Sequence, residues 1–255
     1  MTTDLLWTFV ALALAPCIGS FVGLLTLRLP AGRAWIVARS ACDACQRPLG
    51  IIDLAPIISF LALRGRCRTC GAPIPRRYIV IETGCLIIAA WSGLSQSGAM
   101  ILATALLGWS LLTVAIVDAE HLWLPDVLTW PLGLTGWLVT VALNIAAPWE
   151  PLIGAAVGYG ALAVIAFAYE KLRGRQGMGD GDPRLLGAIG AWVGWDGLPS
   201  VLVWACGAGL GLAAARFLMR GRLDAAQPLP FGTFLAIGAW FTWIWGPMAV
   251  WPPAS

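Results

Sequence analysis

Eight apolar runs, most of them about as long as a membrane is thick, constrain the fold of this chain more than any motif does. A helix needs roughly 20 apolar residues to cross the hydrocarbon core of a bilayer. The runs cover residues 5–27, 78–94, 99–117, 127–147, 151–170, 185–195, 198–217 and 229–250, and the sixth is the shortest. We therefore predict an all-α polytopic membrane protein with about eight transmembrane helices.

The composition excludes two other classes of protein. Hydrophobic residues make up 59% of the chain and charged residues 11%, whereas soluble domains carry about 25% charged residues. A soluble domain is therefore excluded. A net charge of +3 over 255 residues does not supply a surface that follows a phosphate backbone, so we expect membrane lipid and no nucleic acid as a partner.

The basic residues predict the orientation of the chain. All 16 lysines and arginines fall in three clusters, within residues 28–77, 171–184 and 216–222. Eight spans with the N-terminus outside place the three clusters on one side of the membrane. Because basic loops stay on the cytoplasmic side, we predict that this side is cytoplasmic.

Two cysteine pairs lie in the largest hydrophilic stretch, residues 28–77. Cys42 and Cys45 form the first Cys-x-x-Cys pair, and Cys67 and Cys70 form the second. Together they supply the four thiolates of a closed tetrahedral site, so we predict structural zinc that orders a loop too small for a core of its own. Two disulfides or a redox role are the alternatives, and a reducing cytoplasm disfavours the disulfides.

Acidic residues gather next to two of the apolar runs on the predicted cytoplasmic side. Asp118 and Asp126 flank one loop, and Asp180 and Asp182 precede the sixth run. Asp118 ends a predicted helix, where the helix dipole disfavours an anion, so capping does not explain it. Asp126 and Asp182 each have an alternative interpretation as a helix N-cap.

Two carboxylates that share one site do not ionise together easily, so their titrations separate. One then acts as a base toward water, while the other, protonated, polarises a carbonyl group. This is the chemistry of an aspartic peptidase. The single histidine, His121, lies in the loop beside Glu120 and is most simply a solvated residue.

The motifs in this order resemble the type 4 prepilin peptidases, the GxGD-type bifunctional leader peptidase/N-methyltransferases of bacterial inner membranes. The resemblance runs through residues 19–30, the two cysteine pairs with Asp53, Pro56 and Ser59 between them, Tyr78 with Glu82, residues 117–126 and residues 177–192. It implies a first transmembrane helix over residues 1–27, a cytoplasmic zinc-binding loop domain over 28–77 and a membrane peptidase core of seven helices over 78–255.

The resemblance also implies the site residues and the reaction. The catalytic aspartates are expected to be Asp118 and Asp182, because the sequence from Gly181 to Leu185 fits the family's frame and Asp180 does not. The substrates are prepilins and pseudopilins, cleaved after a glycine at the cytoplasmic face, with the N-terminus of the enzyme in the periplasm. The new N-terminal residue is then methylated with S-adenosylmethionine as the donor, for which Glu82 is a candidate contact.

Three residues depart from the family pattern. Arg184 replaces a lysine, Gly23 replaces a frequent asparagine and Gly84 replaces an apolar residue. The last two lie in regions that the family associates with methyl transfer, so the resemblance is more complete for the peptidase. A zinc-loop membrane transporter and a non-catalytic secretion-system assembly factor are the alternative functions. The transporter is disfavoured because nearly all of the acidic residues lie at the ends of the spans, not deep within them.

Overall fold

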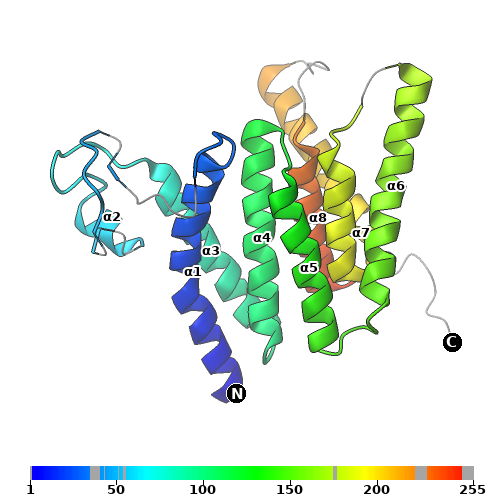
Figure 1. The fold of residues 1–255 in the computed structure, drawn as a ribbon, viewed down its shortest axis with the longest axis horizontal. Coiled ribbons are helices and arrows are strands. Elements are labelled where there is room, and N and C mark those ends of the chain that lie inside the picture. The colour runs from blue at the N-terminus through cyan, green and yellow to red at the C-terminus, as the bar shows by residue number, and fades with distance from the viewer. Residues whose placement is uncertain are drawn as a thin grey trace. The chain divides into compact units, whose positions relative to one another are not determined.

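The computed structural model describes residues 2–34, 41–42, 44–50, 52–53, 56–174, 177–221 and 229–248. Within these ranges the regular structure is helical and contains no strand, which confirms the predicted all-α fold (Figure 1). The helices are α1 (Thr2–Arg28), α2 (Ile58–Ala62), α3 (Arg76–Ser95), α4 (Met100–His121), α5 (Asp126–Ala142), α6 (Glu150–Arg173), α7 (Gly181–Arg220) and α8 (Phe231–Trp245).

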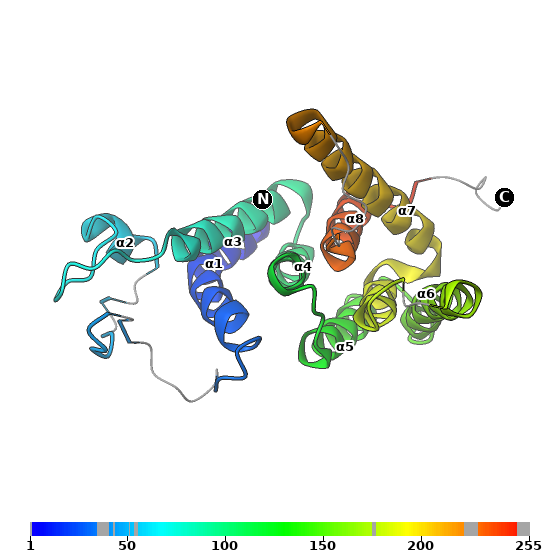
Figure 2. The same cartoon turned by 90° about the horizontal axis from the view of Figure 1, so that it is seen from above.

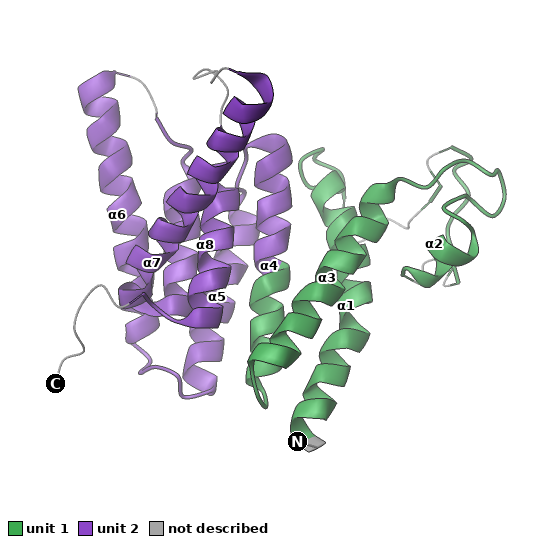
Figure 3. Cartoon of the chain, turned by 180° about the vertical axis from the view of Figure 1, so that it is seen from behind, with its two compact units in different colours: residues 1–109 green, residues 110–255 purple. Residues whose placement is uncertain are grey.

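The chain divides into two compact units, Met1–Trp109 and Ser110–Ser255 (Figure 3). In the first unit α1 packs against α3, and in the second α7 packs against α5, α6 and α8 (Figure 2). The cysteine pairs belong to the first unit. Asp118 and Asp182 both belong to the second unit, so its packing determines their geometry.

Most of the described helices have the length and composition of membrane spans. Five of them, α1, α3, α4, α6 and α7, are long and apolar enough to cross a bilayer. Helix α8 is apolar but has 15 residues, and α5 has 17 residues. The predicted fourth run extends beyond α5, which ends at Ala142 because Asn144 adopts a positive φ of 53° that a helix does not accommodate.

A break at Gly194 divides the 40-residue helix α7 into two segments. Gly194 has φ 73° and ψ 172°, outside the helical region. Glycine adopts this conformation without the steric cost that a Cβ atom would impose. The predicted sixth and seventh apolar runs, residues 185–195 and 198–217, correspond to the segments before and after this break.

The first segment of α7 runs parallel to α8. At its beginning, Gly181 contacts Leu124, which also contacts Gly232 at the beginning of α8. At its end, Trp192 packs against Trp243 near the end of α8, with ring centroids 5.4 Å apart. The two helices therefore begin at the same end of the unit.

The second segment of α7 runs in the opposite direction. Trp204 packs against Phe241 of α8 with ring centroids 5.3 Å apart, and Gly209, further along the chain, lies beside Phe234 near the start of α8. The chain therefore reverses at Gly194, and α7 contributes two antiparallel passes, in agreement with the eight apolar runs.

Close backbone contact joins α6 to the first segment of α7. A Cβ atom on Gly154 would lie 2.2 Å from the carbonyl oxygen of Gly190, and one on Gly158 would lie 2.5 Å from that of Leu186. Small residues allow membrane helices to approach this closely. The contacts fix the position of the segment that begins beside Asp182.

We predict that Gly154→Val destabilises the protein far more than Gly160→Val. Both residues lie in α6, so the change in helix propensity is the same for the two substitutions, but a Cβ atom on Gly160 meets nothing within 4 Å. Overpacking at Gly154 is expected to cost about 1–3 kcal/mol or more. Thermal unfolding in detergent, followed by tryptophan fluorescence, measures the difference, and equal melting temperatures for the two variants would contradict the packing described.

Candidate active site and metal centre

Asp118 is a buried carboxylate at the C-terminal end of α4, with a relative exposure of 4%. Its Oδ2 accepts a hydrogen bond of 2.7 Å from the backbone N–H of Thr233. The Thr233 hydroxyl lies 3.2 Å from the same oxygen and 3.0 Å from the carbonyl oxygen of Ala115. Thr233 belongs to the first turn of α8, where unpaired N–H groups and the helix dipole favour an anion. The C-terminal end of α4 disfavours the negative charge of Asp118, and the N-terminal end of α8 offsets this by favouring it.

Gly232 allows the start of α8 to approach this carboxylate. A Cβ atom on Gly232 would lie 3.1 Å from the Cγ and Oδ2 of Asp118 and 2.7 Å from the Cδ1 of Leu124. Gly232 and Thr233 are parts of the site that were not predicted from the sequence. The available signal was local: Pro230, Gly232 and Thr233 are helix-start residues at the beginning of the last apolar run.

Asp182 lies in the first turn of α7 and has a relative exposure of 6%. Its backbone N–H donates to the carbonyl oxygen of Gly179 at 3.2 Å, and its carboxylate lies close enough to Asp118 for the two charges to interact. This charge interaction, and the contacts of Leu124 with both Gly181 and Gly232, put Asp118 and Asp182 in one region of the second unit, whereas Asp180 is exposed.

The two N-cap interpretations are wrong. Helix α7 begins at Gly181 with Asp180 before it, so Asp182 is already inside the helix. Helix α5 begins at Asp126, and Pro125 occupies the capping position without a side-chain hydrogen bond. The Asp126 carboxylate instead accepts a hydrogen bond of 2.6 Å from the Arg184 guanidinium, an exposed ion pair that links the starts of α5 and α7.

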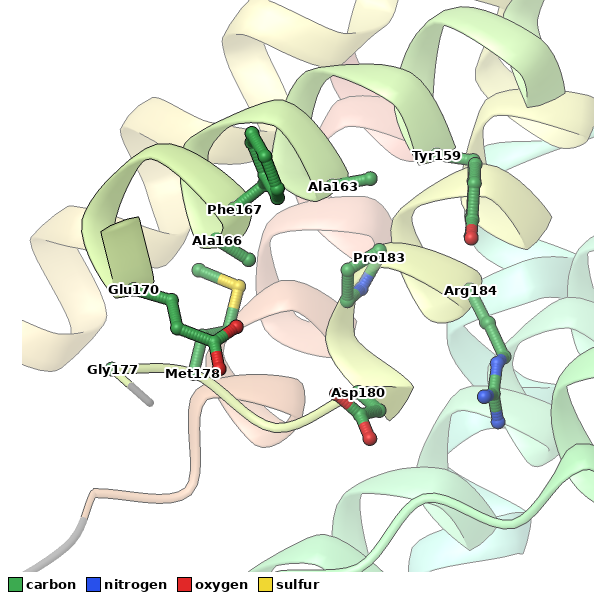
Figure 4. Close-up of a pocket in the computed structure, with 10 residues that line it drawn as sticks. All are labelled: Tyr159, Ala163, Ala166, Phe167, Glu170, Gly177, Met178, Asp180, Pro183 and Arg184. Carbon is green, nitrogen blue, oxygen red and sulfur yellow. The ribbon is translucent and has the colours of Figure 1, made fainter. Parts of the chain in front are cut away.

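A pocket with a cavity volume of about 310 Å³ lies between α6 and the start of α7, where Asp180, Pro183 and Arg184 line it (Figure 4). Helix α6 supplies one wall, and the chain from Gly177 to Arg184 supplies the other. The apolar part consists of Ala163, Ala166, Phe167, Met178 and Pro183, and the acidic part consists of Glu170 and Asp180. The lining combines apolar and charged side chains, which suits an extended peptide segment with both kinds of group.

The two cysteine pairs lie in turns with the same backbone hydrogen bonds. In the first turn the N–H of Cys42 donates to Arg47 at 3.0 Å, and in the second the N–H of Cys67 donates to Ala72 at 2.8 Å. The residue after each second cysteine has a positive φ, 55° at Gln46 and 70° at Gly71. Each turn thereby presents its two sulfur atoms on one side.

The four sulfur atoms have the spacing of a tetrahedral metal site. Those of Cys42, Cys45, Cys67 and Cys70 all lie within 4.8 Å of one another, and the Cys42 and Cys70 sulfurs are 3.8 Å apart. Zinc–sulfur bonds of about 2.3 Å place tetrahedral ligands about 3.8 Å apart, whereas a disulfide needs about 2.05 Å. The four cysteines are free thiols, which argues against the disulfide alternative.

Backbone donors favour a thiolate in the second turn. The N–H groups of Cys70 and Thr69 lower the pKa of the Cys67 thiol to about 6. The thiolate, not the thiol, is the form that binds a metal ion. The residues present therefore fit zinc or another thiophilic ion.

Both sites lie in regions of the chain whose sequence matches known protein families. Residues 13–95 match the Bacterial Peptidase A24 N-terminal domain, and residues 105–214 match the Type IV leader peptidase family. A prepilin leader peptidase/N-methyltransferase from Aeromonas hydrophila is 38% identical over 213 residues, which are 83% of this chain and 73% of the relative.

Two further relatives with that name match over more of the chain. The one from Burkholderia pseudomallei (strain K96243) is 38% identical over 92% of this chain and 84% of its own length. The one from Stutzerimonas stutzeri is 34% identical over 96% of this chain and 93% of its own length. This chain belongs to the type IV leader peptidase family. The resemblance noted in the sequence is thereby confirmed, and no solved structure matches the chain.

In this family member the two matched regions contain different sites. The N-terminal match contains the four cysteines and Glu82, and the peptidase match contains Asp118 and Asp182. Glu82 is buried at 6% relative exposure. Its Oε2 accepts a hydrogen bond of 2.7 Å from the backbone N–H of Ile57, and Gly19 of α1 packs directly against its Cα atom.

Proposed function

We propose that this family member removes the leader peptides of type 4 prepilins and pseudopilins and then methylates the new N-terminal amine. The observation that carries the peptidase half is the meeting of two buried carboxylates, Asp118 and Asp182, from segments far apart in the sequence. The names of the relatives, which cover most of this chain, support both halves.

In the proposed mechanism Asp118 is ionised and Asp182 carries the shared proton, because the donors of Thr233 stabilise negative charge on Asp118. Asp118 takes a proton from a water molecule, whose oxygen attacks the scissile carbonyl carbon. Asp182 donates a hydrogen bond to the carbonyl oxygen as negative charge develops there. The C–N bond then breaks as Asp118 passes the proton that it took from water to the leaving amine, which returns Asp118 to its ionised form while Asp182 keeps its proton.

The pocket lined by Pro183 and Arg184, the two residues that follow Asp182 in the chain, is the proposed binding site for a substrate side chain near the scissile bond. Its wall of Ala163, Ala166 and Phe167 would contact an apolar side chain, and Glu170, Asp180 and Arg184 would contact polar groups of the same segment. Asp118 lies in the last turn of α4 and Asp182 in the first turn of α7, and both helices are long and apolar enough to cross the membrane. Under the positive-inside rule, the three basic clusters support a position of that end at the cytoplasmic face of the inner membrane and of the N-terminus in the periplasm.

The second proposed activity uses S-adenosylmethionine, which supplies the methyl group. Glu82 remains the candidate contact for this donor, as a buried carboxylate in the N-terminal matched region. The four cysteines would hold structural zinc in the same region. A closed four-thiolate site has no open coordination position, so the ion would order the loop and not bind the substrate.

We expect Asp118→Asn and Asp182→Asn each to lower the rate of leader removal by at least about 100-fold, since each removes an acid–base group. Asp180→Asn changes a carboxylate that lines the proposed binding pocket but is not one of the two acids, so it is expected to keep the cleavage activity and to change at most the affinity for the substrate. The assay incubates the purified protein in detergent with a prepilin and a labelled methyl donor, and mass spectrometry reports leader loss and added methyl. Full processing by both variants would reject the paired-aspartate mechanism, and an inactive Asp180→Asn with an active Asp182→Asn would reject the assignment of Asp182.

Gly232→Ala is expected to lower leader removal roughly 10–100-fold, because the new methyl group displaces the Asp118 carboxylate and small misplacements are costly in catalysis. Gly211→Ala is the control, since a Cβ atom there meets nothing within 4 Å. Gly238→Ala serves as a second control, because it crowds Val201 at 2.2 Å in the same helix, away from Asp118. Gly232→Ala could lower the melting temperature as Gly238→Ala does and still leave the cleavage rate unchanged. That result would reject the proposal that the start of α8 positions the Asp118 carboxylate.

Cys42→Ser and Cys67→Ser are each expected to lower the zinc content of the purified protein and the stability of the loop. Cys206→Ser, an exposed cysteine outside the cluster, is the control for loss of a thiol. We expect these variants to lose methylation more than leader removal, because the cysteines and the aspartates lie in different compact units. Metal analysis by mass spectrometry and the assay above measure both effects, and equal loss of the two activities would contradict the separation.

A further inference from the structure

Asp53 is a buried carboxylate between the two cysteine pairs in the sequence. Its side chain has a relative exposure of 8%, and it makes ion pairs with two arginines. Oδ2 lies 2.7 Å from Nη2 of Arg47, and Oδ1 lies 3.0 Å from Nε of Arg68. The backbone N–H of Gly50 donates to Oδ2 at 3.3 Å. Asp53 thus holds two cationic side chains at one point.

The two arginines come from different cysteine turns. The carbonyl oxygen of Arg47 accepts the N–H of Cys42 and closes the first turn. Arg68 lies between the two cysteines of the second turn. The Arg47 guanidinium also donates to the hydroxyl of Thr69, the next residue of that second turn. The side chains that converge on Asp53 therefore connect the two halves of the metal centre.

This connection matters because each turn supplies only two of the four metal ligands. A metal ion that binds two separate turns must otherwise supply the free energy to bring them together. The Asp53 ion pairs hold the turns together before metal binds. One carboxylate and two guanidiniums also leave one net positive charge beside the four thiolates, which opposes their mutual repulsion.

We propose that Asp53 is a positioning residue of the metal centre, which raises the metal affinity of the four cysteines by joining their turns through Arg47 and Arg68. Asp53 is not a ligand in this arrangement, since its two oxygens face the arginines. The proposal rests on the proposed metal site and is independent of the peptidase activity.

The test is a Co²⁺ titration of the metal-stripped full-length protein in detergent, followed by the absorption bands that thiolate ligation gives to Co²⁺. Asp53→Asn keeps the shape of the side chain and removes its charge. It is expected to weaken Co²⁺ binding roughly 10–100-fold, the usual effect of losing a group that orients ligands, and to leave the band positions unchanged. Arg66→Gln is the control, because Arg66 lies in the same loop and makes no ion pair among the described residues.

Arg47→Gln and Arg68→Gln test the connection without changing Asp53. Each is expected to weaken Co²⁺ binding, and combining either with Asp53→Asn should add little, because both remove the same interaction. These variants also decide the question if Asp53→Asn does not yield folded protein. An affinity of Asp53→Asn equal to that of Arg66→Gln, shifted absorption bands, or additive effects in the double variants would overturn the proposal. Unchanged Co²⁺ binding by Cys42→Ser would instead reject the metal site itself.

Discussion

The hydrogen bond between the Asp118 carboxylate and the N-terminus of α8 is the interaction on which the candidate active site depends. A buried carboxylate at the C-terminal end of α4 is unfavourable in isolation, because the helix dipole and the apolar surroundings both oppose its charge. The N–H and hydroxyl of Thr233 provide the donors that offset this cost. Because Leu124 contacts both Gly232 and Gly181, the same contact region sets the start of α7, where Asp182 lies.

The same physical solution recurs in the first compact unit. Glu82 is buried and accepts the backbone N–H of Ile57, from the loop between the cysteine pairs. Ile57 adopts a φ of 59°, which is rare for a β-branched residue. Strain of this kind persists only where surrounding contacts hold it, and the Glu82 hydrogen bond is one such contact. In both units a buried acid therefore connects membrane helices to a segment distant in the sequence.

The sequence was sufficient for the features that depend on local pattern. The apolar runs predicted the all-α fold, and the spacing of the cysteines predicted the cluster, because two short turns bring each pair together. The partners of the aspartates were not predictable in this way. Thr233 lies 115 residues after Asp118, with α5, α6 and α7 between them in the chain. The local pattern marks Gly232 as a helix-start residue, but it does not show that Gly232 packs against Asp118. The N-cap interpretation of Asp126 failed for the same reason, since its partner Arg184 lies in a different helix.

The two sites differ in how much helix packing they need to hold their residues in place. The cysteine centre needs only two short turns, which Asp53 and its arginines connect, so a loop with little core suffices. The aspartate pair needs two membrane helices to end at the same level, and this depends on contacts along their whole length, including the glycines that join α6 to α7. Catalysis by paired carboxylates is sensitive to small displacements, whereas a closed metal site corrects them through its own bonds. The two sites therefore need different surroundings. The aspartates need a unit of packed helices, whereas a loop ordered by a metal ion is sufficient for the cysteines.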